Sequence, residues 1–364
     1  MKVDVLIVGA GFAGGSTAFH LSRNFGGSIL IIEKEQVPGA HASGKNASLL
    51  LQGAQLPEIR RALAASREAY SRHQSELGYK SCGSVLIGRH DQLEGSRQAD
   101  LFHSEYLDAE SVRREIPLLH GHQFESALST PSDGVVDIAA LLQYYLANAQ
   151  SRGVELWLDC EVKTIHRENN FRVETSQGTL EARFIINAAG AWAPQVAQMA
   201  KAAPLPLASF KRHLFLLTEI PELNPEWPFV WSFEQNYYFR YQSGDLLFSL
   251  CDEGRSEGGL EPLVDPEVSE LLAELIWKQL PALREAVQKK VWSCFRTKAP
   301  DGRFVIGWDP LQDDFFWVAA LGGHGMGASW EAGRLAAEKF QRPEIGPDKP
   351  FDPARFQRSV APAH

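Results

Sequence analysis

The stretch that decides the fold lies at the N-terminus and reads Val3-Asp4-Val5-Leu6-Ile7-Val8-Gly9-Ala10-Gly11-Phe12-Ala13-Gly14. Its apolar residues predict a short buried strand, and apolar residues at helical spacing from Thr17 to Phe25 predict a helix directly after the glycines. A second apolar run over residues 28–32 predicts another strand, and Glu33 closes it roughly 20 residues after Gly14. A GxGxxG motif between a strand and a helix, followed at this spacing by an acidic residue, is the dinucleotide-binding fingerprint.

Each part of this motif has a physical role. Gly9 permits a tight turn, Gly11 lets the backbone approach a pyrophosphate, and Gly14 lets the helix pack closely on the strand. The first N–H groups of the helix and the positive end of its dipole favour phosphate, and the Glu33 carboxylate accepts hydrogen bonds from a ribose. We therefore expect a dinucleotide cofactor, NAD or FAD, to be bound by Gly9, Gly11, Phe12, Ala13, Gly14, Glu33 and Lys34.

Composition limits the class of protein. The 364 residues carry a formal charge of −9, with 44% hydrophobic and 22% charged residues, which excludes disordered and fibrous proteins and argues against a nucleic-acid binder. The length predicts two domains, and no apolar run approaches the roughly 18 residues of a membrane helix. Asp4 inside the first apolar run argues against a signal peptide. The four cysteines are far apart, so we expect reduced thiols, no metal site and a cytoplasmic protein.

A small, polar and basic segment follows the second strand and reads Pro38-Gly39-Ala40-His41-Ala42-Ser43-Gly44-Lys45-Asn46-Ala47-Ser48. Ser43 is a good N-cap residue, and we expect it to begin a helix whose first turn, with Lys45, faces an anion. Here the chain resembles the FAD-dependent amino-acid oxidoreductases, a family that includes D-amino-acid dehydrogenases, glycine oxidases and sarcosine oxidases. The resemblance implies that FAD is the cofactor and that its pyrophosphate and flavin lie against Ser43, Gly44, Lys45 and Asn46. Lys45 stands where arginine is commoner, which keeps the charge but loses the bidentate fork.

A segment in the middle of the chain extends the resemblance. A helix from Asp137, a strand within residues 154–165 and a hairpin over residues 171–182 lead into Ile185-Ile186-Asn187-Ala188-Ala189-Gly190-Ala191-Trp192. The resemblance implies that the backbone at Val162 contacts the adenine. It also implies that the chain passes close to the cofactor at Ala188, Ala189, Gly190 and Trp192.

A second glycine cluster, Gly322-Gly323-His324-Gly325-Met326-Gly327, lies between a predicted strand at residues 315–320 and a predicted helix at residues 328–340. A glycine loop at a helix N-terminus is a second anion-favouring feature in the same chain. The resemblance places this loop at the pyrimidine end of the flavin, where a positive helix end would stabilise the negative charge of the reduced ring. The loop residues expected to bind the cofactor are Gly323, His324, Gly325, Met326 and Gly327.

The region from Ala208 to Ser293 predicts a different architecture. Aromatic residues crowd into it, and alternation over residues 211–219 and 237–250 predicts an antiparallel sheet. The fold class is therefore α/β, with a Rossmann-type FAD-binding domain and an interleaved substrate domain on a mostly antiparallel sheet. We assign residues 1–80, 138–205 and 297–345 to the first domain, 81–137 and 206–296 to the second, and 346–364 to a C-terminal tail. A long solvated helix over residues 57–77 is expected to carry no chemistry.

The resemblance implies that the reaction is oxidation of the C–N bond of an amino acid. A cation holds the carboxylate, hydride passes from Cα to flavin N5, and the resulting imine hydrolyses to a 2-oxo acid. The resemblance places the carboxylate-binding arginine at Arg296, with Arg212 and Tyr238 as further candidates and His324 near the flavin. In sarcosine oxidases a cysteine at the position of Cys294 is joined covalently to the flavin. Many relatives lack it, so we expect non-covalent FAD, with Cys294 as the candidate for a covalent link.

The substrate is less well specified. By its motifs the chain most resembles bacterial D-amino-acid dehydrogenases, yet Leu49, Leu50 and Leu51 stand where those enzymes carry polar and aromatic residues. Ser84 stands roughly where an acidic group would meet a cationic side chain, so a neutral or apolar substrate side chain is favoured. D-amino acids, glycine and N-alkyl amino acids all fit this description. Two alternatives stay open, a 2-hydroxy-acid dehydrogenase of the L-2-hydroxyglutarate type and a non-catalytic FAD-binding subunit, and no motif identifies the electron acceptor.

Overall fold

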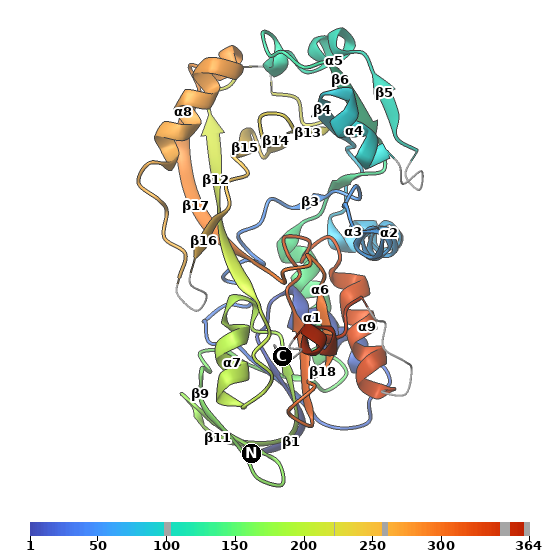
Figure 1. The fold of residues 1–364 in the computed structure, drawn as a ribbon, viewed down its shortest axis with the longest axis vertical. Helices are drawn as coiled ribbons and strands as arrows, with labels where there is room; N and C mark the ends of the chain where they lie inside the picture. Colours follow the sequence, from blue (N-terminus) through green and yellow to red (C-terminus); the bar gives the residue numbers. More distant parts are fainter. Residues whose placement is uncertain (98–102, 222, 257–260, 343–349, 360–364) are drawn as a thin grey trace, which may run out of the picture.

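The computed structural model describes residues 1–97, 103–221, 223–256, 261–342 and 350–359. Two large sheets carry the fold, one in the lower and one in the upper half of Figure 1, and a small sheet of β3 (Leu49–Leu50) and β7 (Gly134–Val135) lies between them. The helices of the lower half pack on a mostly parallel sheet, whereas the upper sheet is mostly antiparallel. The predicted α/β fold class is confirmed.

The first sheet grows from the N-terminal motif. β1 (Lys2–Val8) pairs in parallel with β2 (Ile29–Ile32) and with β11 (Gly178–Asn187), so the middle of the chain returns beside its start. The order is β18-β19-β11-β1-β2-β8, and the antiparallel pair β9 and β10 continues from β11. The other strands of this sheet are β8 (Glu155–Trp157), β9 (Val162–Arg167), β10 (Phe171–Thr175), β18 (Val305–Trp308) and β19 (Phe315–Ala319).

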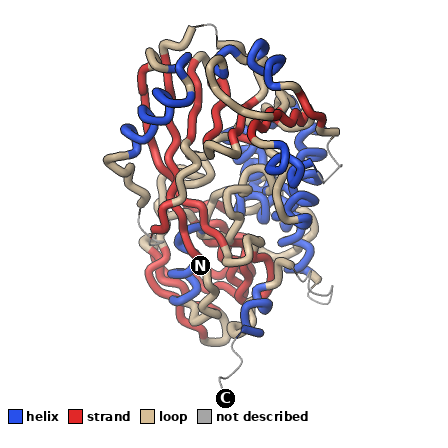
Figure 2. The backbone as a smooth tube through the Cα atoms, turned by 45° about the horizontal axis from the view of Figure 1, so that its top comes forward, coloured by secondary structure: helices blue, strands red, loops and turns tan. Residues whose placement is uncertain are grey.

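Helices cover both faces of this sheet. α1 (Phe12–Leu21), α6 (Ile138–Gln150) and α9 (Ser329–Gln341) share one buried core with Val5 and Ile7, and α7 (Ala193–Met199) packs on the other face against Leu6 and Val8. The helix predicted from Asp137 is confirmed, because this carboxylate caps α6 by accepting hydrogen bonds from the first N–H groups. Figure 2 shows most helices gathered along one side of the molecule, beside the strands.

The second sheet joins two segments that are distant in sequence. Its order is β16-β12-β15-β14-β13-β4-β6-β5, with β17 paired to β12, and all pairs are antiparallel except β13–β4. The antiparallel strands predicted over residues 237–250 are confirmed. The strands are β4 (Ser84–Gly88), β5 (Glu105–Leu107), β6 (Ser126–Thr130), β12 (Ala208–Thr218), β13 (Phe229–Ser232), β14 (Tyr237–Gln242), β15 (Asp245–Ser249), β16 (Gly254–Ser256) and β17 (Val287–Lys298). The helices beside them are α4 (His90–Arg97), α5 (Ala109–Glu115) and α8 (Val268–Gln279).

The prediction of one solvated helix over residues 57–77 is wrong. The chain forms α2 (Pro57–Arg72) and a short α3 (Gln74–Leu77), with a break at His73, whose backbone leaves the helical region at φ −115° and ψ 31°. α2 is amphipathic, and its buried residues, among them Ile59, Leu63 and Tyr70, join the core formed with α9. The charged residues interspersed along this segment suggested a fully solvated helix, although one of its faces is buried.

Two further predictions need correction. The strand expected within residues 154–165 is two strands, β8 and β9, separated where Asp159 takes a positive φ of 54° and the Cys160 N–H bonds the Glu33 carbonyl. The predicted tail is not separate from the fold in its described part, because Phe351 is buried and stacks on Phe304. Residues 343–349 and 360–364 of that tail lie outside the described residues. Across the described parts of the chain, no helix has the length and apolarity needed to cross a membrane.

A buried carboxyl group ties the small central sheet to the second sheet. Asp133 is fully buried and accepts hydrogen bonds from the Ser84 hydroxyl at 2.7 Å and from the Gln52 amide groups at 2.9 and 3.0 Å. Ser84 is therefore committed to this network and does not reach the cavity described below, so the expectation that it meets a substrate side chain is wrong. Burial raises the pKa of Asp133 from 3.8 to about 6.

This network predicts a pH-dependent stability. The unfolded chain releases the Asp133 proton more readily than the folded chain, so folding stability falls as pH rises from about 4 to about 6. Asp133→Asn keeps an acceptor for Gln52 and removes this ionisation. We expect the variant to gain about 2 kcal/mol on the wild type between about pH 4.5 and about pH 7.5, measured by urea unfolding at both pH values. The same difference in unfolding free energy between variant and wild type at both pH values would show that Asp133 does not have a raised pKa in the folded protein.

Candidate active site

One cavity of about 920 Å³ brings together residues from both large sheets. Most residues expected to bind the cofactor line it: Gly9, Gly11, Phe12, Ala13, Glu33, Lys34, Ser43, Asn46, Val162, Ala188, Ala189, Gly190, Trp192, Gly323, His324, Gly325, Met326 and Gly327. The four expected catalytic residues, Arg296, Arg212, Tyr238 and His324, line it as well. Gly14, Gly44 and Lys45 are not among the lining residues.

The first glycine motif brings the backbone close to the cavity. Gly9 has a φ of +105°, and a Cβ there would lie 2.6 Å from the Ala188 carbonyl oxygen, so the ends of β1 and β11 meet closely. A Cβ on Gly11 would lie 2.8 Å from the Ser43 hydroxyl, which accepts a hydrogen bond from the Phe12 N–H at 3.0 Å. Ser43 therefore caps α1, and the prediction that it begins a helix of its own is wrong.

Lys45 turns away from the cavity. Its ammonium group lies 3.5 Å from a Glu261 carboxylate oxygen, and its carbonyl accepts a hydrogen bond from the Trp292 indole at 3.0 Å. A contact of Lys45 with the pyrophosphate therefore stays a prediction. The segment was expected to present a helical turn, but residues 39–45 form tight turns in which Gly44 N–H bonds the Gly39 carbonyl.

One end of the cavity gathers aromatic rings, a lysine and a carboxylate. The Lys34 ammonium lies 3.7 Å from the centre of the Trp192 ring, and the His41 ring packs on the same indole at 4.5 Å. The Glu33 carboxylate accepts a hydrogen bond from the Ala10 N–H at 2.9 Å, which holds it at the end of β2. The contact of His41 with Trp192 could not be predicted, because an isolated histidine in the sequence gives no signal of such ring packing.

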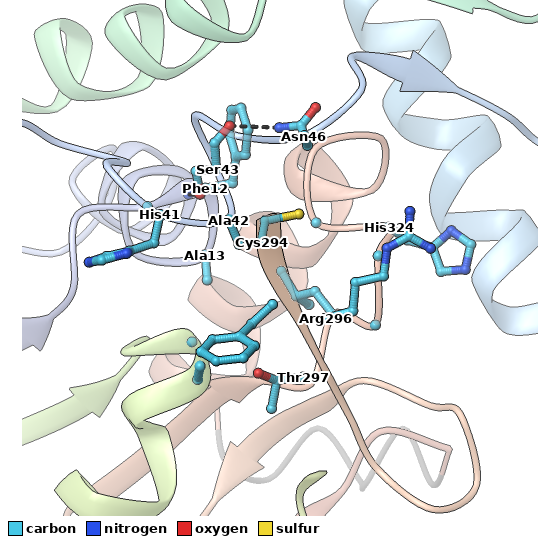
Figure 3. Close-up of a pocket in the computed structure, with 18 of the residues that line it drawn as sticks. Phe12, Ala13, His41, Ala42, Ser43, Asn46, Cys294, Arg296, Thr297 and His324 are labelled. Carbon is cyan, nitrogen blue, oxygen red and sulfur yellow. Dashed lines mark hydrogen bonds between the residues drawn. The ribbon is translucent and has the colours of Figure 1, made fainter. Parts of the chain in front are cut away.

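The opposite end of the cavity holds an unpaired cation. Arg296, near the end of β17, runs beside the glycine loop: a Cβ on Gly323 would lie 3.2 Å from Arg296 Cδ and 3.3 Å from its Nε. Figure 3 shows its guanidinium beside His324 and the Cys294 side chain nearby. Within the described parts of the chain the Arg296 guanidinium makes no hydrogen bond or ion pair, although its backbone pairs with β12. An unpaired, half-buried guanidinium in a cavity is suited to bind a carboxylate through two parallel hydrogen bonds.

Arg212 is placed differently. It is 4% exposed, and its guanidinium donates to the Glu253 carboxylate at 2.9 Å and to the carbonyls of Cys251 and Asp252. Lys298 donates to the same Glu253 carboxylate at 2.7 Å. Protein groups therefore hold the Nε and Nη2 of Arg212, and only its Nη1 lacks a partner among the described residues, whereas the whole guanidinium of Arg296 is free for a carboxylate.

Two further polar side chains at this end, His324 and Tyr238, are uncharged. Burial, with a smaller contribution from the charge of Arg296, lowers the pKa of His324 to about 4, so its imidazole is uncharged at neutral pH. Tyr238 is 1% exposed and packs on Trp231 at 4.9 Å, and burial raises its pKa, so it stays protonated. Apolar lining residues around them include Leu49, Leu51, Leu214 and Phe233. Among the described residues, no group of His, Cys, Asp and Glu could hold a metal ion.

Several lining residues were not found by sequence reasoning. Ile59 and Leu63 come from α2, and Asp252 and Glu253 follow β15. No local pattern marks them, because their approach depends on helix packing and on the pairing of β12 with β15 and β17. The aromatic content of residues 208–293 was the one signal that pointed to this wall.

The geometry fits an elongated dinucleotide, because two anion-favouring helix N-termini, those of α1 and α9, lie along the cavity. The cavity reaches from the Trp192 stack, past the start of α1, to the glycine loop before α9. Three consecutive loop N–H groups, those of Gly325, Met326 and Gly327, make no hydrogen bond within the described residues. Such N–H groups at a helix N-terminus are free to bind an electron-rich ring oxygen or nitrogen.

Comparison with known proteins decides the family. Residues 4–339 match the model described as FAD dependent oxidoreductase, DAO. The chain belongs to this family. Its cofactor is FAD, and the recognition made from the sequence motifs is confirmed.

Individual relatives are distant. The chain is 26% identical to monomeric sarcosine oxidase of Streptomyces avermitilis over 388 residues, which covers 99% of both proteins. It is 25% identical to the mitochondrial pyruvate dehydrogenase phosphatase regulatory subunit of Mus musculus over 365 residues, which covers 93% of the chain and 41% of that protein. A crystal structure of L-proline dehydrogenase from P. horikoshii superposes with a TM-score of 0.87 at 21% identity and 98% coverage of each chain. The chain spans about two-fifths of the length of the mitochondrial relatives, which include dimethylglycine dehydrogenase.

The cysteine at the FAD site leads to a prediction. Cys294 lines the cavity but is 5% exposed, and burial raises the pKa of its thiol, which disfavours the thiolate needed for attachment to a flavin. We expect acid precipitation of the yellow protein to leave all flavin colour in the supernatant. Cys294→Ser serves as the control and should release the same amount. Colour that stays in the wild-type pellet and is lost from that of the variant would establish the covalent link instead.

Proposed function

We propose that this FAD-dependent protein oxidises the C–N bond of an amino acid with a neutral side chain: a D-amino acid, glycine or an N-alkyl amino acid. One observation carries the proposal, the unpaired guanidinium of Arg296 beside the glycine loop. Relatives named as sarcosine oxidase and dimethylglycine dehydrogenase support the substrate class. When bound, FAD accepts the hydrogen and the electron pair that leave Cα. The nitrogen lone pair forms the C=N bond, and water then hydrolyses the imine to a 2-oxo acid and an amine.

The charges around the cavity support a substrate with a single carboxylate. Glu253 is shared by Arg212 and Lys298, and the Asp252 carboxylate accepts a hydrogen bond from His213 Nδ1 at 2.7 Å. The His213 Nε2 accepts from the Asp265 N–H, so His213 is a neutral tautomer that donates from Nδ1. Arg296 then supplies the cation that no described protein carboxylate contacts, and one substrate carboxylate matches it.

The other lining residues orient the substrate and exclude water. Leu49, Leu51 and Trp231 offer an apolar surface to the substrate side chain, and the protonated Tyr238 hydroxyl is a donor beside Arg296. At neutral pH the His324 imidazole is uncharged and keeps a single N–H, so it does not act as a cationic acid. We therefore propose that the substrate amine loses its proton to water before oxidation, and that His324 serves as a neutral donor or acceptor near the ring.

The two large sheets support the assignment of FAD binding and substrate binding to different parts of the chain. We propose that residues 1–80, 138–205 and 297–345 bind FAD and that residues 81–137 and 206–296 cover the substrate. The described residues 350–359, which pack on the first sheet through Phe351, would belong with the FAD-binding part.

Matched substrate pairs test the proposal. Turnover with an artificial electron-accepting dye is measured for alanine and lactate of each configuration, which differ in the atom on Cα, and for glycine, sarcosine and a 2-hydroxydicarboxylate. We expect dye reduction with amines and release of a 2-oxo acid. Preference for the hydroxy acid of each pair would establish the C–O reaction instead. Yellow protein that reduces dye with none of them would favour a non-catalytic subunit, the role that the name of the Mus musculus regulatory subunit suggests.

A further inference from the structure

A buried cluster of hydroxyl groups lies directly behind the glycine loop. Tyr70 of α2 donates a hydrogen bond to the Met326 carbonyl at 2.8 Å. Its oxygen also lies 2.9 Å from the Ser329 hydroxyl, which lies 3.0 Å from the Tyr145 hydroxyl of α6. All three side chains have zero exposed surface, so α2, α6 and α9 meet in one buried cluster, and two of its hydroxyls, those of Tyr70 and Ser329, bond the loop carbonyl.

The bond from Tyr70 fixes the orientation of a peptide group. The Met326–Gly327 peptide is trans, so its N–H points away from its carbonyl oxygen. Because the carbonyl is turned into the hydroxyl cluster, the Gly327 N–H is turned the opposite way, and Gly327 lines the cavity. Ser329 adds its own hydroxyl and N–H to the same carbonyl at 3.0 and 3.2 Å.

The rest of α2 supports the same loop. The Ser66 hydroxyl accepts a hydrogen bond from the Glu331 N–H in the first turn of α9. A Cβ on Gly327 would lie 2.9 Å from Leu63 Cδ2, so α2 packs against the loop without a gap. Burial raises the pKa of Tyr70, so its hydroxyl stays a donor throughout the neutral range.

We propose that Tyr70 is a positioning residue that, through the Met326 carbonyl, holds the loop N–H groups toward the flavin of bound FAD. The inference rests on the proposed function only for the position of the flavin against this loop. Reduction places negative charge on the flavin, so the aimed N–H groups stabilise reduced FAD more than oxidised FAD. Tyr70, which does not line the cavity, thus acts on the cofactor through the loop and not by contact.

The test uses Tyr70→Phe, with Tyr145→Phe as the matched control. Tyr145→Phe removes a hydroxyl from the same buried cluster, but this hydroxyl makes no hydrogen bond to the Met326 carbonyl. Dissociation constants of oxidised FAD are measured on the apoproteins by fluorescence, and two-electron potentials on the holoproteins with a reference dye. We expect Tyr70→Phe to raise the dissociation constant of oxidised FAD about tenfold. The dissociation constant of reduced FAD should rise by a further factor of about three, which lowers the midpoint potential by about 14 mV. Tyr145→Phe should change the dissociation constant less than twofold.

Either of two outcomes would overturn the inference: a change within twofold for Tyr70→Phe, or equal changes for both variants. If Tyr70→Phe does not yield folded protein, Ser329→Ala removes the second hydroxyl donor to the same carbonyl, and we expect about a threefold weaker FAD complex, with no change as the contrary result. Neither measurement needs a substrate. Wild-type protein that binds FAD but oxidises no amino acid would therefore reject the proposed function and leave this test intact.

Discussion

Replacing Arg296 with methionine is expected to lower kcat/KM for the amino-acid substrate about a thousandfold, with the FAD content unchanged. The reason is that the Arg296 guanidinium lines the cavity and has no partner among the described protein groups. It can therefore donate two hydrogen bonds to the substrate carboxylate. Charge-assisted hydrogen bonds contribute about 1.5–3 kcal/mol each, and two of them give roughly 4 kcal/mol, or about a thousandfold in rate. The measurement is the rate of flavin bleaching under anaerobic conditions against substrate concentration.

Arg296→Lys is the matched control for charge. It keeps the cation but loses the planar fork, so we expect a loss of about tenfold, carried mainly by KM. Arg212 offers a contrast, because Arg212→Met would leave Glu253 with only Lys298 and lower stability before it affects binding. A kcat/KM within threefold of wild type for Arg296→Met would show that Arg296 does not bind the substrate carboxylate.

The second large effect is expected at Gly14, where Gly14→Ala should abolish FAD binding and lower stability by at least about 4 kcal/mol. A Cβ at this position would lie 1.9 Å from the Gly9 carbonyl oxygen, which is backbone and cannot move without opening the turn between β1 and α1. The measurements are urea unfolding and the ratio of flavin to protein absorbance after purification.

Gly15 supplies the control for this prediction. A Cβ there would meet only the ends of the Leu142 and Leu146 side chains, at 3.2 and 3.4 Å, which can shift. The gain in helix propensity from Gly15→Ala, about 1 kcal/mol, offsets that adjustment, so we expect near-wild-type stability and full flavin content. Equal losses for the two variants would show that the close approach of Gly14 to Gly9 does not decide the fold.

Much of the cofactor site could be predicted from the sequence because its determinants are local. The strand, the glycine turn and the helix of residues 3–21 are consecutive, and hydrophobic spacing and glycine conformational freedom decide their structure. The glycine loop before α9 was predicted for the same reason.

The rest depends on contacts between distant segments. Tyr70 meets Met326 across 256 positions of sequence, and Asp133 binds Gln52 across 81. Nothing near Arg212 in the sequence indicates that it shares the Glu253 carboxylate with Lys298, since the register of β12 with β15 and β17 brings these residues together. Ser84 was misplaced because its burial depends on the parallel pairing of β4 with β13.

Anaerobic mixing of the purified yellow protein with single substrates shows directly whether it oxidises amino acids. We expect glycine, an N-methyl amino acid or a neutral D-amino acid to bleach the flavin fully and to yield one 2-oxo acid per flavin after hydrolysis. Re-admission of air then reports whether oxygen accepts the electrons. Bleaching by 2-hydroxy acids with no response to any amino acid, or no bleaching by either class, would contradict the account.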